Sequence, residues 1–139
     1  MKEQHNQALI ESLYAAFGRG DIPFILNRLT SDVEWTMEGP SDLPFTGTFH
    51  GPEGVLQFFQ GLGSTQSNQK LTMTDVIAQG DKVAGVGRYA ANVKSTGKSF
   101  DSAVAHYFVI RDGKVARFYD FINTHEVAQA YQASAAAAR

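Results

Sequence analysis

The chain has 139 residues, 43% of them hydrophobic, no cysteine and a formal net charge of −2. This length and composition suit one soluble domain with a single core, and the lack of cysteine excludes disulfides and thiol catalysis. The charge balance offers no basic surface for nucleic acid, residues 1–7 lack the apolar run of a signal peptide, and no stretch is long enough to span a membrane. We therefore expect a cytoplasmic protein that binds neither nucleic acid nor membranes.

The first third of the chain predicts two helices and a strand. Apolar residues recur at three- and four-residue spacing over residues 5–18, which is typical of an amphipathic helix, and the glycines at 18 and 20 end it. Asp21 is placed to cap a short second helix with Pro23 in its first turn. Apolar and polar side chains then alternate over Val33–Glu38, which indicates a strand.

The middle of the chain contains one more helix between less regular segments. Turn residues over Gly39–Pro44 predict a loop, and a short extended segment follows at residues 45–49. Gly51-Pro52-Glu53 opens a third helix. Residues 61–70 are polar and contain glycine, so they predict a second loop.

The second half predicts four strands, over residues 71–79, 82–94, 100–111 and 114–123, with hairpin turns at Gly80-Asp81, Thr96-Gly97 and Asp112-Gly113. Asn123 or Thr124 can cap a last helix, with Glu126 placed for a capping box. The alanine tail over residues 135–138 is expected to fray.

Helices followed by a long meander indicate an α+β fold. Strands this long in a small domain must curl, so we expect a cone-shaped, cystatin-like roll. In it a curved antiparallel sheet and three to four helices enclose a pocket. One domain should cover residues 1–139, with a core over about 5–132, because no linker or repeat interrupts the chain.

The strongest candidate for chemistry is the pair His106 and Asp120. Each is the polar residue in an otherwise apolar row of its strand, and the turn at Asp112-Gly113 makes the two strands neighbours. An apolar row disfavours the charged form of a carboxyl, whereas a nearby imidazolium favours it. Such a pair suits general acid/base catalysis, and the alternative is a buried pair with only a structural role.

Further residues are candidates for binding a ligand. The predicted lining of the pocket is apolar and favours apolar or aromatic ligands over sugars and nucleotides; it comprises Trp35, Met37, Phe58, Phe59, Phe108, Phe118 and Ile122. For Trp35 and Met37 the alternative is plain core packing. Arg88 either points inward to hold an anionic group or Asp120, or lies exposed on the outer face.

No cofactor or metal is expected. His5, His50 and His125 are scattered, and no pair has metal-ligand spacing. There is no nucleophile elbow, phosphate loop or dinucleotide motif, since Gly85-Val86-Gly87 lies within a strand. Glycine at these positions indicates a bulge that helps the sheet curl.

Four segments carry a family resemblance: Tyr14–Asp21, Leu29–Trp35, Phe49–Val55 and His106–Thr124. On these, the chain resembles the nuclear transport factor 2-like superfamily, nearest to its SnoaL-like and ketosteroid isomerase-related branches. The resemblance implies one SnoaL-like domain. It also supports Asp120 as a catalytic residue, because SnoaL-like cyclases place an acidic acid/base residue on the corresponding last strand.

The match to ketosteroid isomerases is incomplete. His106 aligns with their acidic oxyanion-hole residue, but Met37, with Glu38 beside it, stands where their general base lies. Their helix tyrosine falls near Leu13, one place from Tyr14. True ketosteroid isomerase activity is therefore not expected.

Two functions stay open. One is a proton-transfer enzyme of isomerase, cyclase or hydrolase type that acts on a small apolar molecule bearing a carbonyl or a ring. The other is a non-catalytic binding or dimerisation module, because this fold hosts both. We also expect a homodimer, since aromatic and apolar residues on the second sheet face would otherwise be exposed; these are Tyr89, Tyr107, Val109, Tyr119 and Phe121.

Overall fold

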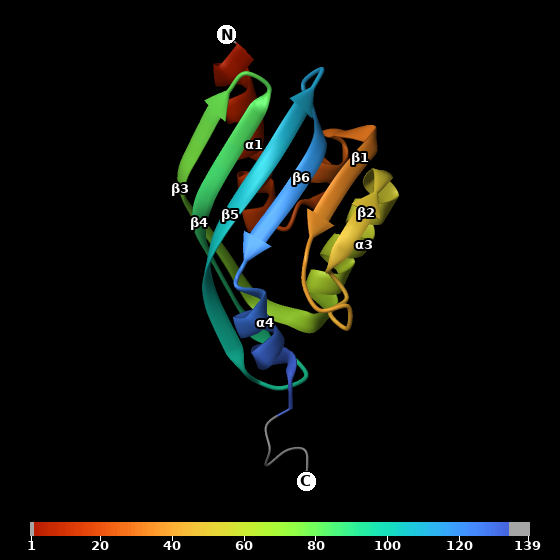
Figure 1. Cartoon of the computed structure of the whole chain (residues 1–139), viewed down its shortest axis with the longest axis vertical. Helices are drawn as coiled ribbons and strands as arrows, with labels where there is room; N and C mark the ends of the chain where they lie inside the picture. Colours follow the sequence, from red (N-terminus) through yellow and green to blue (C-terminus); the bar gives the residue numbers. More distant parts are fainter. Residues whose placement is uncertain (1, 134–139) are drawn as a thin grey trace.

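The computed structural model describes residues 2–133 and shows four helices and six strands within them (Figure 1). In chain order these are α1 (Lys2–Gly18), α2 (Ile22–Leu26), β1 (Leu29–Met37), β2 (Gly47–His50), α3 (Gly51–Thr65), β3 (Gln66–Gln79), β4 (Lys82–Val93), β5 (Ser99–Arg111), β6 (Lys114–Ile122) and α4 (Thr124–Tyr131). The predicted α+β class is confirmed. The alanine tail that was expected to fray lies outside the described residues.

The strands form one curved sheet in the order β2-β1-β6-β5-β4-β3. Strands β3 to β6 are an antiparallel meander, as predicted, but β1 pairs with β6 in parallel, so the sheet is mixed rather than antiparallel. The reason lies at the start of β1. Leu29 pairs with Val115 at the beginning of β6, and Trp35 with Phe118 further along, so both strands run the same way.

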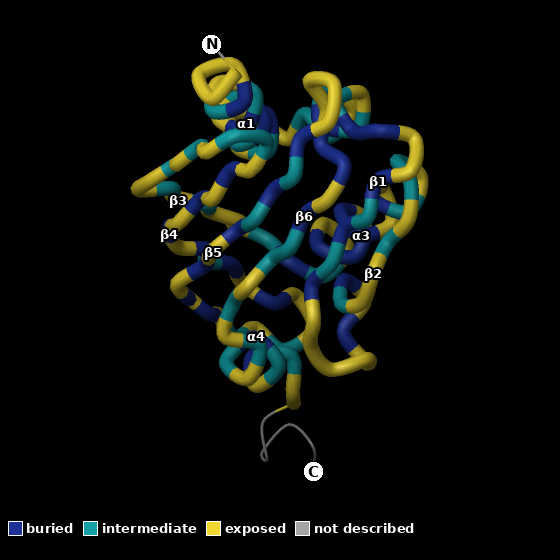
Figure 2. The backbone as a smooth tube through the Cα atoms, turned by 45° about the horizontal axis from the view of Figure 1, so that its top comes forward, coloured by how far each residue is buried: buried dark blue, intermediate teal, exposed yellow. Residues whose placement is uncertain are grey.

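The helices cover only one face of the sheet. Figure 1 shows α1 and α3 behind the sheet and α4 below it, while the front face carries no helix. The side chains between helices and sheet form the core, and buried positions alternate with exposed ones along β4 and β5 (Figure 2). The curved sheet and its helices thus enclose an inner space, as the predicted roll requires.

The helix caps and the β5–β6 turn form where the sequence predicts them. The Asp21 carboxylate accepts from the backbone N–H of Phe24 and caps α2, and the Asn123 side chain accepts from that of Glu126 and caps α4. At the β5–β6 turn, Asp112 and Gly113 both have positive φ, at 53° and 77°, which matches the favoured twist of a two-residue hairpin.

The predicted loop at residues 61–70 is wrong. Helix α3 continues to Thr65, and β3 begins at Gln66. Gly61 does not break the helix, because it serves a close contact instead: a Cβ there would lie 2.8 Å from the carbonyl oxygen of Pro44. The glycine lets α3 pack against the preceding loop.

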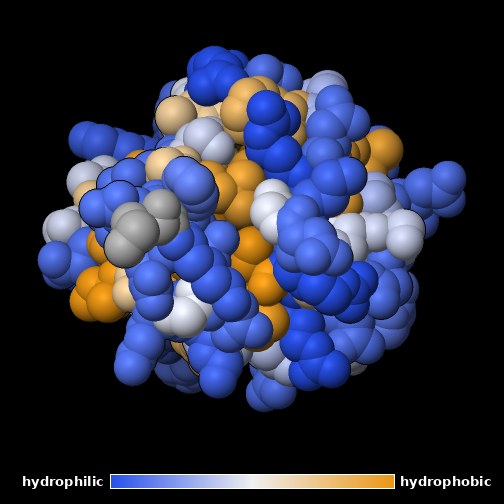
Figure 3. All heavy atoms as spheres, turned by 90° about the horizontal axis from the view of Figure 1, so that it is seen from above, coloured by the Kyte–Doolittle hydropathy of each residue, from blue (hydrophilic) through white to orange (hydrophobic). Residues whose placement is uncertain are grey.

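None of the helices within residues 2–133 combines the length and the apolar composition that crossing a bilayer requires. Viewed along the long axis from the end that bears the N-terminus, apolar side chains show in a furrow between hydrophilic rims (Figure 3).

Candidate active site

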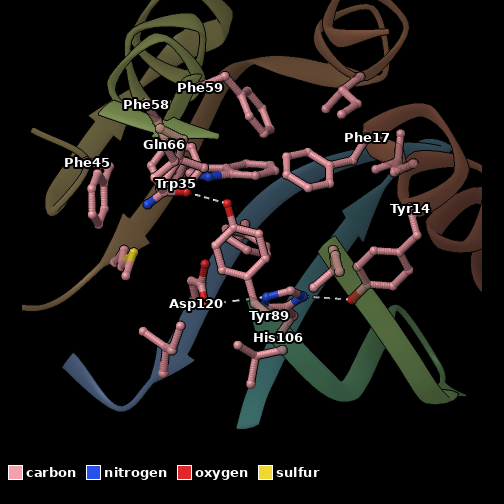
Figure 4. Close-up of a pocket in the computed structure, with 18 of the residues that line it drawn as sticks. Tyr14, Phe17, Trp35, Phe45, Phe58, Phe59, Gln66, Tyr89, His106 and Asp120 are labelled. Carbon is pink, nitrogen blue, oxygen red and sulfur yellow. Dashed lines mark hydrogen bonds and ion pairs between the residues drawn. The ribbon is translucent and has the colours of Figure 1, made fainter. Parts of the chain in front are cut away.

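The inner space contains a cavity of about 80 Å³ between the sheet and helices α1, α3 and α4. All seven apolar residues that the sequence predicted for the pocket line it: Trp35, Met37, Phe58, Phe59, Phe108, Phe118 and Ile122. Polar side chains also reach its wall, and Figure 4 shows how they lie. The cavity is therefore mostly apolar, with a few polar groups at fixed places.

His106 and Asp120 lie side by side in this wall. They are directly paired in the β5–β6 register, as expected from the turn that joins the strands. His106 Nε2 lies 3.4 Å from Asp120 Oδ1, which is within ion-pair distance. The contact does not meet hydrogen-bond geometry, so within residues 2–133 the buried Oδ1 has no hydrogen-bond partner. A carboxyl group that lines an apolar cavity thus lies beside an imidazole.

Tyr14, which lies on α1, is the third residue of this site. Its hydroxyl lies 2.9 Å from Nδ1 of His106, and the two rings stack with centroids 5.7 Å apart. Burial raises the pKa of the Tyr14 phenol well above its ordinary value of 10.0, and the Asp120 carboxylate raises it further. The phenol therefore keeps its proton and can donate it to Nδ1. When the phenol donates to Nδ1, the proton of the neutral imidazole lies on Nε2, which faces Asp120.

Gly85 on β4 makes the Tyr14–His106 bond possible. Gly85 pairs with His106 across the β4–β5 ladder, and a Cβ at position 85 would lie 2.2 Å from the Tyr14 hydroxyl. Absence of a side chain here leaves room for the phenol to reach the imidazole. The bulge that the sequence predicted for this region lies in the partner strand, where the β3–β4 register shifts between Met73 and Asp75.

A second polar cluster borders the cavity where α3 meets β3. The Tyr89 hydroxyl donates to Oε1 of Gln66, and Gln66 Nε2 donates to the Tyr131 hydroxyl on α4 at 2.9 Å. Gln69 Nε2 donates to Tyr89 at 2.9 Å. Burial also raises the pKa of the Tyr89 phenol. These side chains form hydrogen bonds with one another, so the cluster has a structural role.

The position of Tyr89 differs from the one predicted from the sequence. The sequence predicts Tyr89 on the second sheet face, but the residue is buried and lines the cavity. Inward positions on β4 are the odd-numbered ones, because Val83 and Ala91 are in the core. Tyr89 therefore belongs to the same face as Gly85.

The same alternation places Arg88 outside. Arg88 Nε donates to Asp101 Oδ1 at 2.9 Å, and the side chains of both residues are more than half exposed. Arg88 therefore neither lines the cavity nor reaches Asp120, which removes it from the candidate binding residues. Glu38, which lies beside the position of the ketosteroid isomerase base, is also exposed, while its neighbour Met37 points inward.

The remaining histidines do not join the site. His5, His50 and His125 are exposed, and His50 lies 4.0 Å from Glu34 on the surface. Among residues 2–133, no group of three or more histidine, aspartate or glutamate side chains could hold a metal ion.

Comparison with known proteins places the chain in a family. The sequence pattern of the SnoaL-like domain matches residues 10–118, which is most of the chain. The chain belongs to the SnoaL-like domain family. An NTF2-like protein of Burkholderia thailandensis has a similar structure, with 31% identity, a TM-score of 0.84 and coverage of 91% of this chain and 97% of that one.

Two further relatives are similar to this SnoaL-like chain. TerC, co-crystallised with polyporic acid, is 27% identical with a TM-score of 0.82, over 90% of this chain and 96% of its own. An uncharacterised protein of Mycobacterium tuberculosis is 27% identical over 125 residues, which cover 87% of this chain and 91% of that protein. The family resemblance seen in the sequence is thus confirmed.

Two residues of this site are not predicted from the sequence. The sequence places Tyr14 one residue away from the tyrosine position of ketosteroid isomerases, yet the Tyr14 hydroxyl reaches His106, while Leu13 packs in the core. At Gly85 the sequence predicts only a bulge. The hairpin register would have placed Gly85 opposite His106, which was the available signal.

Proposed function

We propose that this SnoaL-like protein is an acid/base enzyme that moves a proton on a small, mostly apolar molecule bearing a carbonyl or a ring. The observation that carries the proposal is the environment of Asp120. Asp120 lines an apolar cavity beside His106, and its buried Oδ1 has no hydrogen-bond partner within the described residues. An oxygen held in this way is suited to exchange a proton with a ligand rather than to stabilise the fold.

Asp120 is the proton carrier in this proposal. As a base, its carboxylate takes a proton from a carbon next to a carbonyl group: the C–H bond breaks, an O–H bond forms on Asp120, and the electron pair stays on the ligand as an enolate. Returning the proton to the same or another atom of the ligand regenerates the carboxylate. The apolar wall excludes water, which would otherwise compete for the proton.

His106 and Tyr14 are positioning residues for Asp120. The Tyr14 hydroxyl fixes the imidazole by its bond to Nδ1, and this orients Nε2 toward the carboxyl. Nε2 lies 3.4 Å from the carboxyl oxygen Oδ1 and does not occupy it through a hydrogen bond. TerC gives further support, because a relative that was co-crystallised with polyporic acid binds a small organic molecule.

The second candidate function is a non-catalytic binding module. The observation in its favour is the size of the cavity: about 80 Å³ is small beside the roughly 300–1,000 Å³ of many ligand pockets. This candidate requires no proton transfer at Asp120. It predicts binding of small apolar compounds without any change in them.

Proton exchange on simple ketones separates the two candidates. Cyclohexanone and cyclohex-2-enone are incubated with the protein in D₂O, and loss of the signals of protons next to the carbonyl is followed by NMR. We expect exchange above the buffer rate that saturates with ketone concentration. If either ketone binds and its exchange stays at the buffer rate, the binding module is the better description.

A further inference from the structure

We infer that Trp35 donates its indole N–H to a ligand oxygen, and that the ligand is a single-ring compound with a carbonyl group and a second polar or acidic group. The hydrogen bond from Trp35 does not depend on catalysis, whereas the second polar group of the ligand rests on the proposed role of Asp120. The starting observation is that Nε1 of Trp35 is buried and has no hydrogen-bond partner within residues 2–133.

Trp35 is held firmly in the cavity wall. The residue is 4% exposed, and its ring stacks on Phe118 with centroids 3.9 Å apart. Phe58 and Phe59 pack on it at 5.9 and 5.7 Å. Figure 4 shows the indole extending into the space ringed by Phe17, Phe59 and Tyr89. Buried indole N–H groups usually have a partner, so this one is a donor available to a ligand.

The second available group is Oδ1 of Asp120, and its place relative to Trp35 follows from the strand register. Trp35 pairs with Phe118, and Asp120 lies two residues further along β6, opposite Met37. With strands about 4.8 Å apart and about 3.3 Å per residue, the two backbone positions lie about 8 Å apart on one sheet face. A six-membered ring with substituents can contact both side chains.

The cavity limits the size of the ligand. At about 80 Å³ it is smaller than the cavity of roughly 150 Å³ that holds benzene in a well-studied lysozyme variant. Even a single ring therefore requires side-chain adjustments, and fused rings require a larger rearrangement. The apolar wall disfavours sugars and phosphates, since their polar groups would be left without partners. The chemistry that fits is an oxygenated monocycle, such as a hydroxylated aromatic carbonyl compound or a cyclic ketone.

The sequence contains one tryptophan, so the indole N–H gives a single side-chain signal in a ¹⁵N-correlated NMR spectrum. The probes are 3-hydroxybenzaldehyde and 3-ethylphenol, which differ mainly in the carbonyl oxygen. We expect the aldehyde to move the indole proton signal downfield and the ethyl compound to leave its hydrogen bonding unchanged. Equal shifts with both probes, or no indole shift at saturation with the aldehyde, would overturn the inference, as would failure of both probes to bind.

The variant Trp35→Phe removes the donor and keeps an aromatic ring. We expect the affinity for 3-hydroxybenzaldehyde to fall about tenfold and that for 3-ethylphenol to change far less, because loss of one buried hydrogen bond has this size. Equal weakening of both probes would contradict the inference. Should this variant not fold, the wild-type spectra decide alone. The indole shift in the wild type reports the hydrogen bond of Trp35 whether or not Asp120 transfers a proton, so failure of the proposed function would leave this test intact.

Discussion

At the scale of single residues, the site depends on one hydrogen bond and on the glycine beside it. Tyr14 and His106 come from α1 and β5, 92 positions apart in the chain, and meet at 2.9 Å over Gly85. The phenol fixes the imidazole, and the imidazole faces Asp120. A substitution at Gly85 should therefore displace the Tyr14 phenol. The phenol would no longer fix the His106 imidazole, and the imidazole would no longer be held facing Asp120.

Gly85→Ala should lower catalytic rate and stability together. The added Cβ would meet the end of the Tyr14 side chain, which can move away only by giving up its bond to His106. We expect a loss of about 1–3 kcal/mol in the free energy of unfolding, the usual cost of overpacking. Denaturant unfolding and the ketone exchange rate measure the two effects.

Tyr14→Phe is the matched background for this change. It removes the hydroxyl that the new Cβ would meet, so Gly85→Ala should cost less in that background than in the wild type. Equal costs in both backgrounds would show that the hydroxyl is not what Gly85 accommodates. Gly87→Ala is the contrast, because its Cβ would meet the backbone oxygen of Thr72 at 2.2 Å, a contact that no side-chain motion relieves.

The raised pKa of the Tyr14 phenol should make the free energy of unfolding depend on pH in the alkaline range. Its pKa is raised in the folded state, so the unfolded chain loses this proton first, at about its ordinary value of 10.0. The stabilisation is complete below that pH and declines above it, by up to about 1.4 kcal/mol per pH unit for each such group. Unfolding measured from pH 9 to 11 should show a shallower decline for Tyr14→Phe than for the wild type. Identical declines would contradict the burial of this phenol.

At the scale of elements, helix α4 is fixed to the rest of the fold through Tyr131. Its hydroxyl accepts from Gln66 and lies 2.8 Å from that of Thr65, while Val127 on the same helix lines the cavity. Ala130 on this helix is also buried. The polar cluster at the start of β3 therefore holds one wall of the cavity in place.

Tyr131→Phe should loosen α4 more than the rest of the fold. Removing the hydroxyl leaves the buried Gln66 amide without its acceptor, which costs about 1–3 kcal/mol. Amide hydrogen exchange should become faster in residues 124–131 and change little in β5 and β6. Tyr107→Phe is the matched control, because the Tyr107 hydroxyl forms no hydrogen bond to the described residues. An equal effect of the two variants would contradict this role of Tyr131.

Most elements could be predicted from the sequence, and the exceptions have physical causes. Hairpin turns and period-two patterns set the meander and its register, which is why His106 and Asp120 were placed together correctly. The parallel β1–β6 pairing joins segments distant in sequence, and no local signal marks it. The glycine at 61 serves a helix contact that only the tertiary structure reveals. Arg88 and Tyr89 were ambiguous because β4 has small residues on both faces.

At the scale of the whole molecule, the helices within residues 2–133 leave one face of the sheet uncovered. Phe121 and Val86 there are 57% and 43% exposed, and Tyr119 stacks on Phe121 and packs at a tilt against Tyr107. We propose that a second copy of the chain covers this face, because a contiguous apolar patch of this kind marks an interface.

Sedimentation at micromolar concentration should therefore show a dimer, and Phe121→Lys should shift it toward monomer by placing a charge in the interface. Leu56→Lys changes an exposed apolar residue on α3, on the other side of the sheet, and is the control. A wild-type monomer at these concentrations would contradict the dimer, as would equal dissociation by both substitutions.

The most direct measurement for the proposed site compares ketone proton exchange by the wild type, Asp120→Asn and Asp101→Asn. Asp101 undergoes the same chemical change on the exposed face, where its partner is Arg88. We expect Asp120→Asn to lower the exchange rate by about 10²-fold or more, with ligand affinity nearly intact and a melting temperature that holds or rises, and Asp101→Asn to keep the wild-type rate. Full activity in Asp120→Asn would remove Asp120 from the mechanism, and a collapse of its melting temperature would instead assign the Asp120–His106 pair a structural role.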